Sequence, residues 1–196
     1  YFIEKEIVAF DSNVFNNAKN KYLIGYGQNE NYFNEIREEI LKDFKPKEDI
    51  SIEAQTHLAK IKNVNSISIH VRRGDYLNNL HTNNVHGICN LNYYKNAIKI
   101  VSNEVYAPMY FIFSDDILWC KENFDFLDNK VFIDGTESAI DDLELMKNCK
   151  HNIIANSTFS WWGAWLNEND KKIVIAPKKW FNINNLNIAS DLWILL

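Results

Sequence analysis

The sequence predicts an α/β protein with a doubly wound, mostly parallel sheet of the Rossmann-like kind. Short apolar runs typical of buried strands alternate with longer amphipathic stretches typical of helices. Connections of this length suit β-α-β crossovers between parallel strands. The composition agrees, because 46% of the 196 residues are hydrophobic and 24% are charged. Such a chain can bury a sizeable core, which excludes global disorder.

Residues 1–62 are predicted to form a mostly helical connecting segment, and residues 63–196 the α/β domain. Residues 29–44 place Phe33, Ile36 and Ile40 at helical spacing, with Asn31 or Glu30 near the start of the helix. A second helix is expected over residues 53–61.

The α/β domain begins with a strand over residues 66–71, where Ile67, Ile69 and Val71 alternate with small or polar side chains. The continuous apolar run 109–113 suits a strand that is buried on both faces. The remaining elements follow in the same alternation. We expect strands over 130–133, 151–155 and 172–176, and helices over 90–102, from a cap at Ser114 or Asp115 to about Phe124, over 138–149, and after Ser157.

In doubly wound sheets, ligands bind beyond the carboxyl ends of the strands. The segment His70-Val-Arg-Arg-Gly-Asp-Tyr76 follows the first strand of the domain. Arginine offers a planar fork of donors that matches phosphate oxygens two at a time, and Gly74 allows the backbone to turn and approach closely. Asp75 can orient one arginine or cap the next segment. A structural Arg–Asp pair at the strand end is the alternative interpretation.

Ser114-Asp115-Asp116 follows the second strand of the domain and admits three interpretations. The carboxylates can cap a helix, bind a base or ribose, or hold a hard cation.

Asn156-Ser157-Thr158-Phe159-Ser160 follows another strand and begins a helix. The N–H groups of a first helical turn, together with three hydroxyls, form an anion site that needs no net positive charge. The nearby Trp161, Trp162 and Trp165 suit core packing, with a sugar-stacking platform as the alternative. The arginine pair and this helix terminus together suggest a diphosphate ligand.

Charge and cysteine usage exclude several classes of protein. A net charge of −5 without a basic block argues against a nucleic-acid partner. Cys89, Cys120 and Cys149 form no C-x-x-C pair, so neither a disulfide framework nor a zinc site is expected and a reducing compartment is favoured. His81 and His86 are interpreted as solvated loop residues. No apolar stretch approaches the ~18–20 residues that span a bilayer, which favours a soluble, cytoplasmic protein.

The motifs together resemble those of the α-1,2-fucosyltransferases of glycosyltransferase family 11, bacterial type. The resemblance rests on the His70–Tyr76 segment, on Phe113-Ser-Asp-Asp116 followed by Trp119, and on Asp142-Leu-Glu-Leu-Met with His151 to Leu166. Gly25-Tyr-Gly-Gln28 with Tyr32-Phe33 resembles a further stretch, in which Gly27 replaces a more usual aromatic residue.

The resemblance implies an inverting enzyme on a GT-B-like scaffold that transfers L-fucose from GDP-β-L-fucose to the 2-hydroxyl of a galactose-terminated glycan. It implies no metal and no cofactor. It also implies a bacterial cytoplasmic location, at the inner face of the membrane with peripheral association, since such acceptors are often lipid-linked.

The resemblance also implies roles for individual residues. Arg72, His70 and Asp75 are the candidate catalytic residues, although the sequence assigns the general base to neither His70 nor Asp75. The candidate donor-binding residues are Arg72, Arg73, Asp116, Asp142, Asn156, Ser157, Thr158, Phe159 and Ser160. Residues 63–196 would then be the GDP-sugar-binding domain.

Family members begin with a Gly-rich segment and a further N-terminal lobe, and the sequence is therefore expected to be a fragment that lacks this lobe. A truncated or non-catalytic GDP-sugar-binding module is the alternative function.

Overall fold

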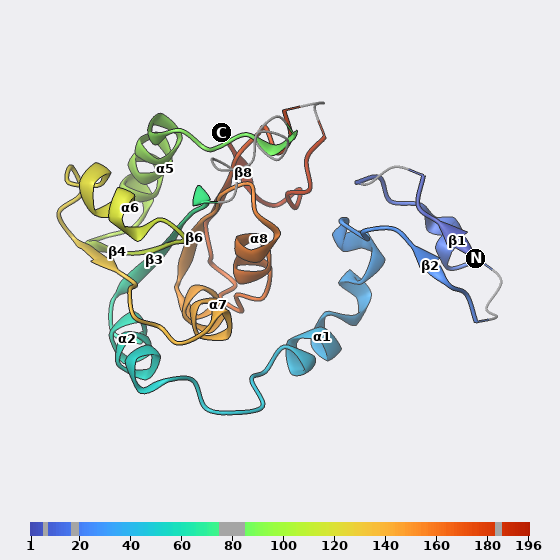
Figure 1. The fold of residues 1–196 in the computed structure, drawn as a ribbon, viewed down its shortest axis with the longest axis horizontal. Coiled ribbons are helices and arrows are strands. Elements are labelled where there is room, and N and C mark those ends of the chain that lie inside the picture. The colour runs from blue at the N-terminus through green and yellow to red at the C-terminus, as the bar shows by residue number, and fades with distance from the viewer. Residues whose placement is uncertain (6–7, 17–19, 75–84, 183–185) are drawn as a thin grey trace.

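A computed structural model describes residues 1–5, 8–16, 20–74, 85–182 and 186–196 (Figure 1). Within these ranges the chain forms a parallel sheet with helices on both faces, as the sequence predicts. The strand order is β5-β4-β3-β6-β7-β8. Numbered from β3 onwards, this is the order 3-2-1-4-5-6 of a doubly wound nucleotide-binding fold.

The two long strands of the sheet, β3 and β4, have seven residues each and lie side by side, and the other strands have two or three residues. The bounds are β3 Asn65–Val71, β4 Pro108–Ser114, β5 Lys130–Phe132, β6 His151–Ile153, β7 Val174–Ala176 and β8 Ile194–Leu195. The predicted strands are therefore present, although β6 and β7 are shorter than the apolar runs that contain them. Strand β8 was not predicted, because two residues are too few to show a period.

Helices α5 (Leu91–Glu104) and α6 (Ile117–Asn123) cover one face of the sheet, where they pack on Ile67, Ile69 and Ile112. Helices α2 (Ile52–Lys62) and α7 (Ala139–Asn148) pack on Phe111 and Phe113 of the opposite face. Helix α8 (Thr158–Trp165) covers β6 and β7 on that same side. Both faces of the central strands are thus buried.

A buried polar chain ties the centre of the sheet to the helices. The Asn152 amide of β6 donates to Ser68 Oγ of β3 at 2.7 Å and to the carbonyl oxygen of Met146 at 2.9 Å. Asn167, just after α8, donates from Nδ2 to Asn152 Oδ1 at 2.8 Å. Each of these three side chains is at most 2% exposed, so the hydrogen bonds offset the cost of burying polar groups.

The segment 29–44 differs from the continuous helix that was predicted. Its described structure is two 3-10 turns, η2 (Glu30–Tyr32) and η3 (Asn34–Ile36), followed by the helix α1 (Arg37–Asp43). Asn29 caps the first turn. The break lies at Phe33, whose ring packs against Trp161, Trp162 and Trp165 of α8 at centroid distances of 5.3–6.1 Å. Tertiary packing here overrides local helical periodicity.

Residues 1–62 contain less helix than expected. Besides α1, α2 and the two turns, the described part holds a 3-10 turn η1 (Ser12–Val14) and a parallel pair of two-residue strands, β1 (Phe2–Ile3) and β2 (Leu23–Ile24). This pair lies apart from the main sheet, and α1 runs between it and the α/β body (Figure 1).

Candidate active site at the switch point of the sheet

A cleft of about 670 Å³ lies where the strand order reverses, between the carboxyl ends of β3 and β6. This is the position at which doubly wound folds bind their ligands. Residues that follow three neighbouring strands meet there. Its described lining is Tyr26, Gln28, His70, Arg72, His86, Ser114, Asp115, Ala139, Asp142, Asn156, Ser157, Thr158, Phe159, Trp180 and Phe181.

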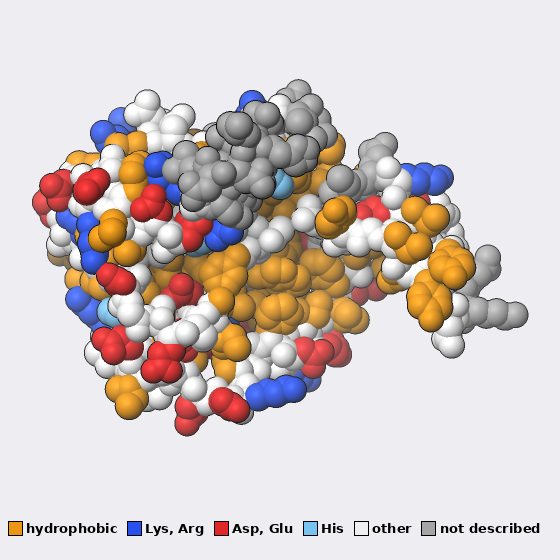
Figure 2. Space-filling view, viewed as in Figure 1, with side chains coloured by type: hydrophobic (Ala, Val, Ile, Leu, Met, Phe, Trp, Pro, Cys, Tyr) orange, Lys and Arg blue, Asp and Glu red, His pale blue; other side chains and the backbone are white. Residues whose placement is uncertain are grey.

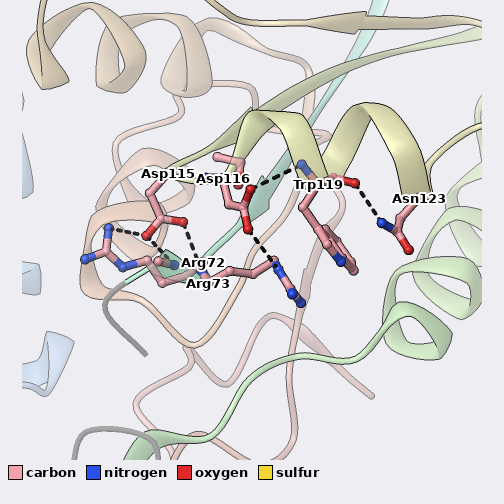
Figure 3. Close-up of polar contacts among 8 residues, drawn as sticks. Arg72, Arg73, Asp115, Asp116, Trp119 and Asn123 are labelled. Atoms are coloured by element: carbon pink, nitrogen blue, oxygen red, sulfur yellow. Dashed lines mark hydrogen bonds and ion pairs between the residues drawn. The ribbon is translucent and has the colours of Figure 1, made fainter. Parts of the chain in front are cut away.

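Asp115 holds Arg72 at the mouth of this cleft (Figure 3). Its Oδ2 lies 3.2 Å from Nη1 of Arg72, and the arginine side chain remains 33% exposed. The same carboxylate accepts the backbone N–H groups of Arg73 at 2.9 Å and Gly74 at 3.0 Å. A Cβ at Gly74 would lie 2.9 Å from Asp115 Oδ2, so any other residue here would displace the Asp115 carboxylate.

Arg73 and Asp116 form a separate pair that does not border the cleft. The guanidinium carbon of Arg73 lies 3.7 Å from the centroid of the Trp119 ring, and its Nε is 3.5 Å from Asp116 Oδ2 (Figure 3). Asp116 also accepts the Trp119 N–H at 3.2 Å and so caps α6, a role that the sequence assigned to Ser114 or Asp115. Donor binding by Arg73 and Asp116 therefore finds no support from their placement.

His70 ends the row of β3 side chains that face α2, α7 and α8, and its side chain borders the cleft. It is 5% exposed, and its Nδ1 has no hydrogen-bond partner among the described residues. Burial, reinforced by the neighbouring Arg72 charge, lowers the pKa of His70 to about 3. The imidazole is therefore neutral at physiological pH.

The amino terminus of α8 faces the cleft through Ser157, Thr158 and Phe159. Ser157 occupies the N-cap position with extended backbone angles, but its side chain makes no capping hydrogen bond. This differs from the predicted cap, and it leaves the first-turn N–H groups without a side-chain acceptor from Ser157. A bound anion would satisfy these groups.

Two other residues of this segment make internal contacts. The Ser160 hydroxyl is fully buried and donates to the carbonyl oxygens of Ala155 and Ser157 at 3.4 and 3.2 Å. The Asn156 amide donates to the carbonyl oxygen of His86 at 2.8 Å and to that of Trp180 at 3.3 Å. Neither arrangement directs a hydroxyl or amide donor toward a ligand in the cleft.

Asp142, in the first turn of α7, is the second carboxylate that borders the cleft. Burial raises the pKa of its carboxyl above the ordinary value, and the hydrogen bond from Thr136 Oγ1 at 2.9 Å partly offsets that rise. Asp75, the remaining catalytic candidate, lies outside the described residues.

The cleft is also lined by residues that were not among the candidate catalytic or donor-binding residues. Asp115 directly follows a predicted strand, and this position could have selected it. Tyr26 and Gln28 belong to a short stretch that resembles the family and lies well before the predicted strands in the sequence. Trp180 and Phe181 follow β7 without a pattern that distinguishes them from core residues.

In the described part of the chain, no group of three or more His, Cys, Asp or Glu side chains is arranged to hold a metal ion. Nor does it contain a helix that is both long and apolar enough to span a bilayer.

The chain matches the family described as Glycosyl transferase family 11 over residues 3–193. It belongs to glycosyltransferase family 11.

This family 11 chain is 43% identical to the Alpha-1,2-colitosyltransferase of Escherichia coli, over 84% of its own length and 57% of that protein. It is 38% identical to the O-antigen biosynthesis glycosyltransferase WbnK of Escherichia coli, over 100% of its length and 68% of the relative. The Galactoside 2-alpha-L-fucosyltransferase SEC1 of Bos taurus is 29% identical over 74% of this chain and 41% of that protein.

Among solved structures, fucosyltransferase NodZ from Bradyrhizobium aligns with this family 11 chain at a TM-score of 0.38 and 13% identity. The alignment covers 68% of this chain and 58% of that one. In the two Escherichia coli comparisons, the chain spans little more than half the length of the colitosyltransferase and about two thirds of WbnK.

Proposed function

We propose that this family 11 protein takes part in transfer of a deoxysugar, L-fucose or colitose, from a GDP-linked donor to the 2-hydroxyl of a galactoside. One observation carries the proposal: Arg72 and the amino terminus of α8 face the same cleft at the switch point of the sheet. Colitose enters because one relative is named a colitosyltransferase and another a fucosyltransferase.

In an inverting transfer, the acceptor oxygen attacks the anomeric carbon from the side opposite the phosphate. A new C–O bond forms while the bond between the sugar and the phosphate oxygen breaks, and the electron pair remains on GDP. The acceptor hydroxyl gives its proton to a base. Negative charge therefore develops on the departing diphosphate, and groups that meet this charge stabilise the transition state more than the ground state.

Arg72 and α8 are suited to that task without a metal ion. The guanidinium offers two parallel donors to phosphate oxygens, and Asp115 fixes its position. The first-turn N–H groups of α8 add donors whose direction is fixed by the helix. His70 fits a role in shaping the donor pocket better than that of general base, because a pKa of about 3 makes it a weak proton acceptor at neutral pH.

Calorimetric titration with GDP, with UDP and ADP as controls, tests the donor site. We expect GDP to bind and Arg72→Ala to weaken binding by roughly 10- to 100-fold, the range for a charge-assisted hydrogen bond of ~1.5–3 kcal/mol. Lys121→Ala is the matched control, because Lys121 pairs with Asp134 on the surface at 2.7 Å, outside the cleft. Unchanged GDP affinity in Arg72→Ala would remove the basis of the proposal.

Transfer is tested with GDP-fucose and GDP-colitose in parallel, lactose as acceptor, and NMR assignment of the product linkage. A product with the α-1,2 linkage and inverted configuration supports the enzyme and identifies its donor. GDP binding without transfer from either donor would favour the alternative, a GDP-sugar-binding module.

A further inference from the structure

A second cavity, of about 250 Å³, adjoins the donor cleft. Tyr26, Gln28 and Thr158 border both spaces, so the two lie side by side. The walls of the second cavity include Phe33, Trp161 and Trp162, and Figure 2 shows hydrophobic side chains in the hollow between the α/β body and the amino-terminal segment. A ligand that spans both spaces would pass between Gln28 and the amino terminus of α8.

The two cavities differ in charge. The donor cleft is lined by Arg72, Asp115 and Asp142, whereas the described lining of the second cavity includes no charged side chain. Aromatic walls with a few amide and hydroxyl groups suit a neutral ligand that has both apolar faces and hydroxyls. A sugar ring has this character, and a diphosphate does not.

Gln28 supplies an unpaired hydrogen-bonding group at the junction. Its Oε1 is buried and has no hydrogen-bond partner among the described residues. A buried acceptor without a partner costs about 1–3 kcal/mol, and a ligand hydroxyl would remove that cost. Neighbouring Asn29 is engaged differently, since its amide already bonds the carbonyl oxygen of Val8 at 2.9 Å and the N–H of Asn31 at 3.0 Å.

We propose that the second cavity is the acceptor subsite, in which a galactoside ring lies against the aromatic wall and donates a hydroxyl hydrogen bond to Gln28 Oε1. This inference rests on the proposed function. In-line inversion places the acceptor oxygen across the anomeric carbon from the phosphate, so the acceptor must occupy space beside the phosphate site. The second cavity meets this requirement, because Thr158 in the first turn of α8 lines both it and the donor cleft.

Saturation-transfer NMR with methyl β-galactoside, in the presence of saturating GDP, tests the assignment on the whole chain. We expect Gln28→Leu to weaken galactoside binding about three- to tenfold, the effect of one neutral hydrogen bond, and to change GDP affinity by a smaller factor. Tyr26→Ala is a second variant, at a side chain that is 74% exposed and so unimportant for the core. Asn31→Ala, an exposed amide outside both cavities, is the matched control.

Failure of this inference differs from failure of the proposed function. If GDP itself does not bind, the donor site is wrong. The acceptor subsite is overturned if GDP binds but the galactoside does not. It is also overturned if the galactoside binds Gln28→Leu and Tyr26→Ala as tightly as it binds the unchanged protein. A loss of GDP affinity in Gln28→Leu as large as the loss of galactoside affinity would also overturn it, since Gln28 would then act mainly on the donor.

Discussion

Arg72 and Arg73 are adjacent in the chain, yet their guanidinium groups meet different partners. Just beyond β3 the chain sends Arg72 to Asp115 at the cleft and Arg73 to Asp116 and Trp119 beside α6. Asp115 therefore keeps Arg72 at the candidate site, whereas Asp116 keeps Arg73 in a structural contact. Because the Arg73 ring contact and ion pair anchor the turn, they help to fix where Arg72 lies.

Asp115 is expected to act as a positioning residue for the donor site. Asp115→Ala removes the partner of Arg72 and the acceptor of two backbone N–H groups. We expect about tenfold weaker GDP binding by calorimetry, in line with loss of a charge-assisted contact. Asp115→Asn keeps an acceptor oxygen and should lose less. Asp134→Ala, at an exposed pair, serves as control, and an Asp115→Ala variant that binds GDP like the unchanged protein would contradict this role.

His70 is expected to make the fold sensitive to acid. The unfolded chain takes up a proton at His70 near the ordinary pKa of about 6.5, whereas the folded chain does so only at about 3. The unfolded state therefore binds more protons between these values, and stability falls as pH is lowered through that window.

Urea unfolding at pH 7, 5.5 and 4 measures this effect. His70→Gln should lose less stability on acidification than the unchanged protein, while His57→Gln, on helix α2 away from the cleft, should follow the unchanged protein. Identical pH dependence in the unchanged protein and His70→Gln would show that His70 is not buried in its neutral form.

At the scale of elements, the hydrogen-bonded chain of Ser68, Asn152 and Asn167 joins β3, β6 and the end of α8. It holds together the two strands between which the cleft opens. Asn152→Ala leaves the Met146 carbonyl and the Ser68 hydroxyl without their amide partner. We expect the free energy of unfolding to fall by about 2–4 kcal/mol, since buried polar groups lose their partners.

Chemical denaturation with Asn63→Ala as reference checks this value. The Asn63 amide donates to the exposed carbonyl of Ala59, so its removal should change stability by less than about 0.5 kcal/mol. Equal losses in the two variants would mean that the buried chain contributes nothing specific.

The elements that sequence periodicity could predict are those long enough to repeat a pattern. Strands β3 and β4 and helices α2, α5 and α7 were predicted to within two residues at each end. Strands β1, β2 and β8 are two residues long and carry no period. The break at Phe33 depends on indole rings more than a hundred residues away, which local spacing does not encode.

The candidate site was predictable to a similar extent. The rule that ligands lie beyond strand ends located Arg72 and Ser157 at one cleft, whereas Asp142 was selected through the family resemblance. It could not distinguish Arg72 from Arg73, because the direction of a side chain after a strand depends on the partners that the fold brings near. The rule could not select Gln28, because this residue belongs to the amino-terminal segment and follows none of the predicted strands.

For the whole molecule, the reversal of strand order places the candidate site between two halves of the sheet. Strands β3, β4 and β5 lie on one side of the reversal, and β6, β7 and β8 on the other. A GDP molecule held by both Arg72 and the amino terminus of α8 would connect these halves. Ligand binding should therefore restrict local opening on both sides of the cleft at once.

Hydrogen exchange measured by mass spectrometry, with and without saturating GDP, tests this expectation. Peptides that contain residues 70–74 and 156–160 should both exchange more slowly with GDP, because the backbone N–H groups there lie beside the ligand or are fixed by it. Peptides from the middle of α5, which packs on one face of the sheet away from the strand ends, provide an internal reference. Protection confined to 70–74 would mean that α8 does not hold the diphosphate. At a GDP concentration that only just saturates the unchanged protein, Arg72→Ala should lose protection in both segments together.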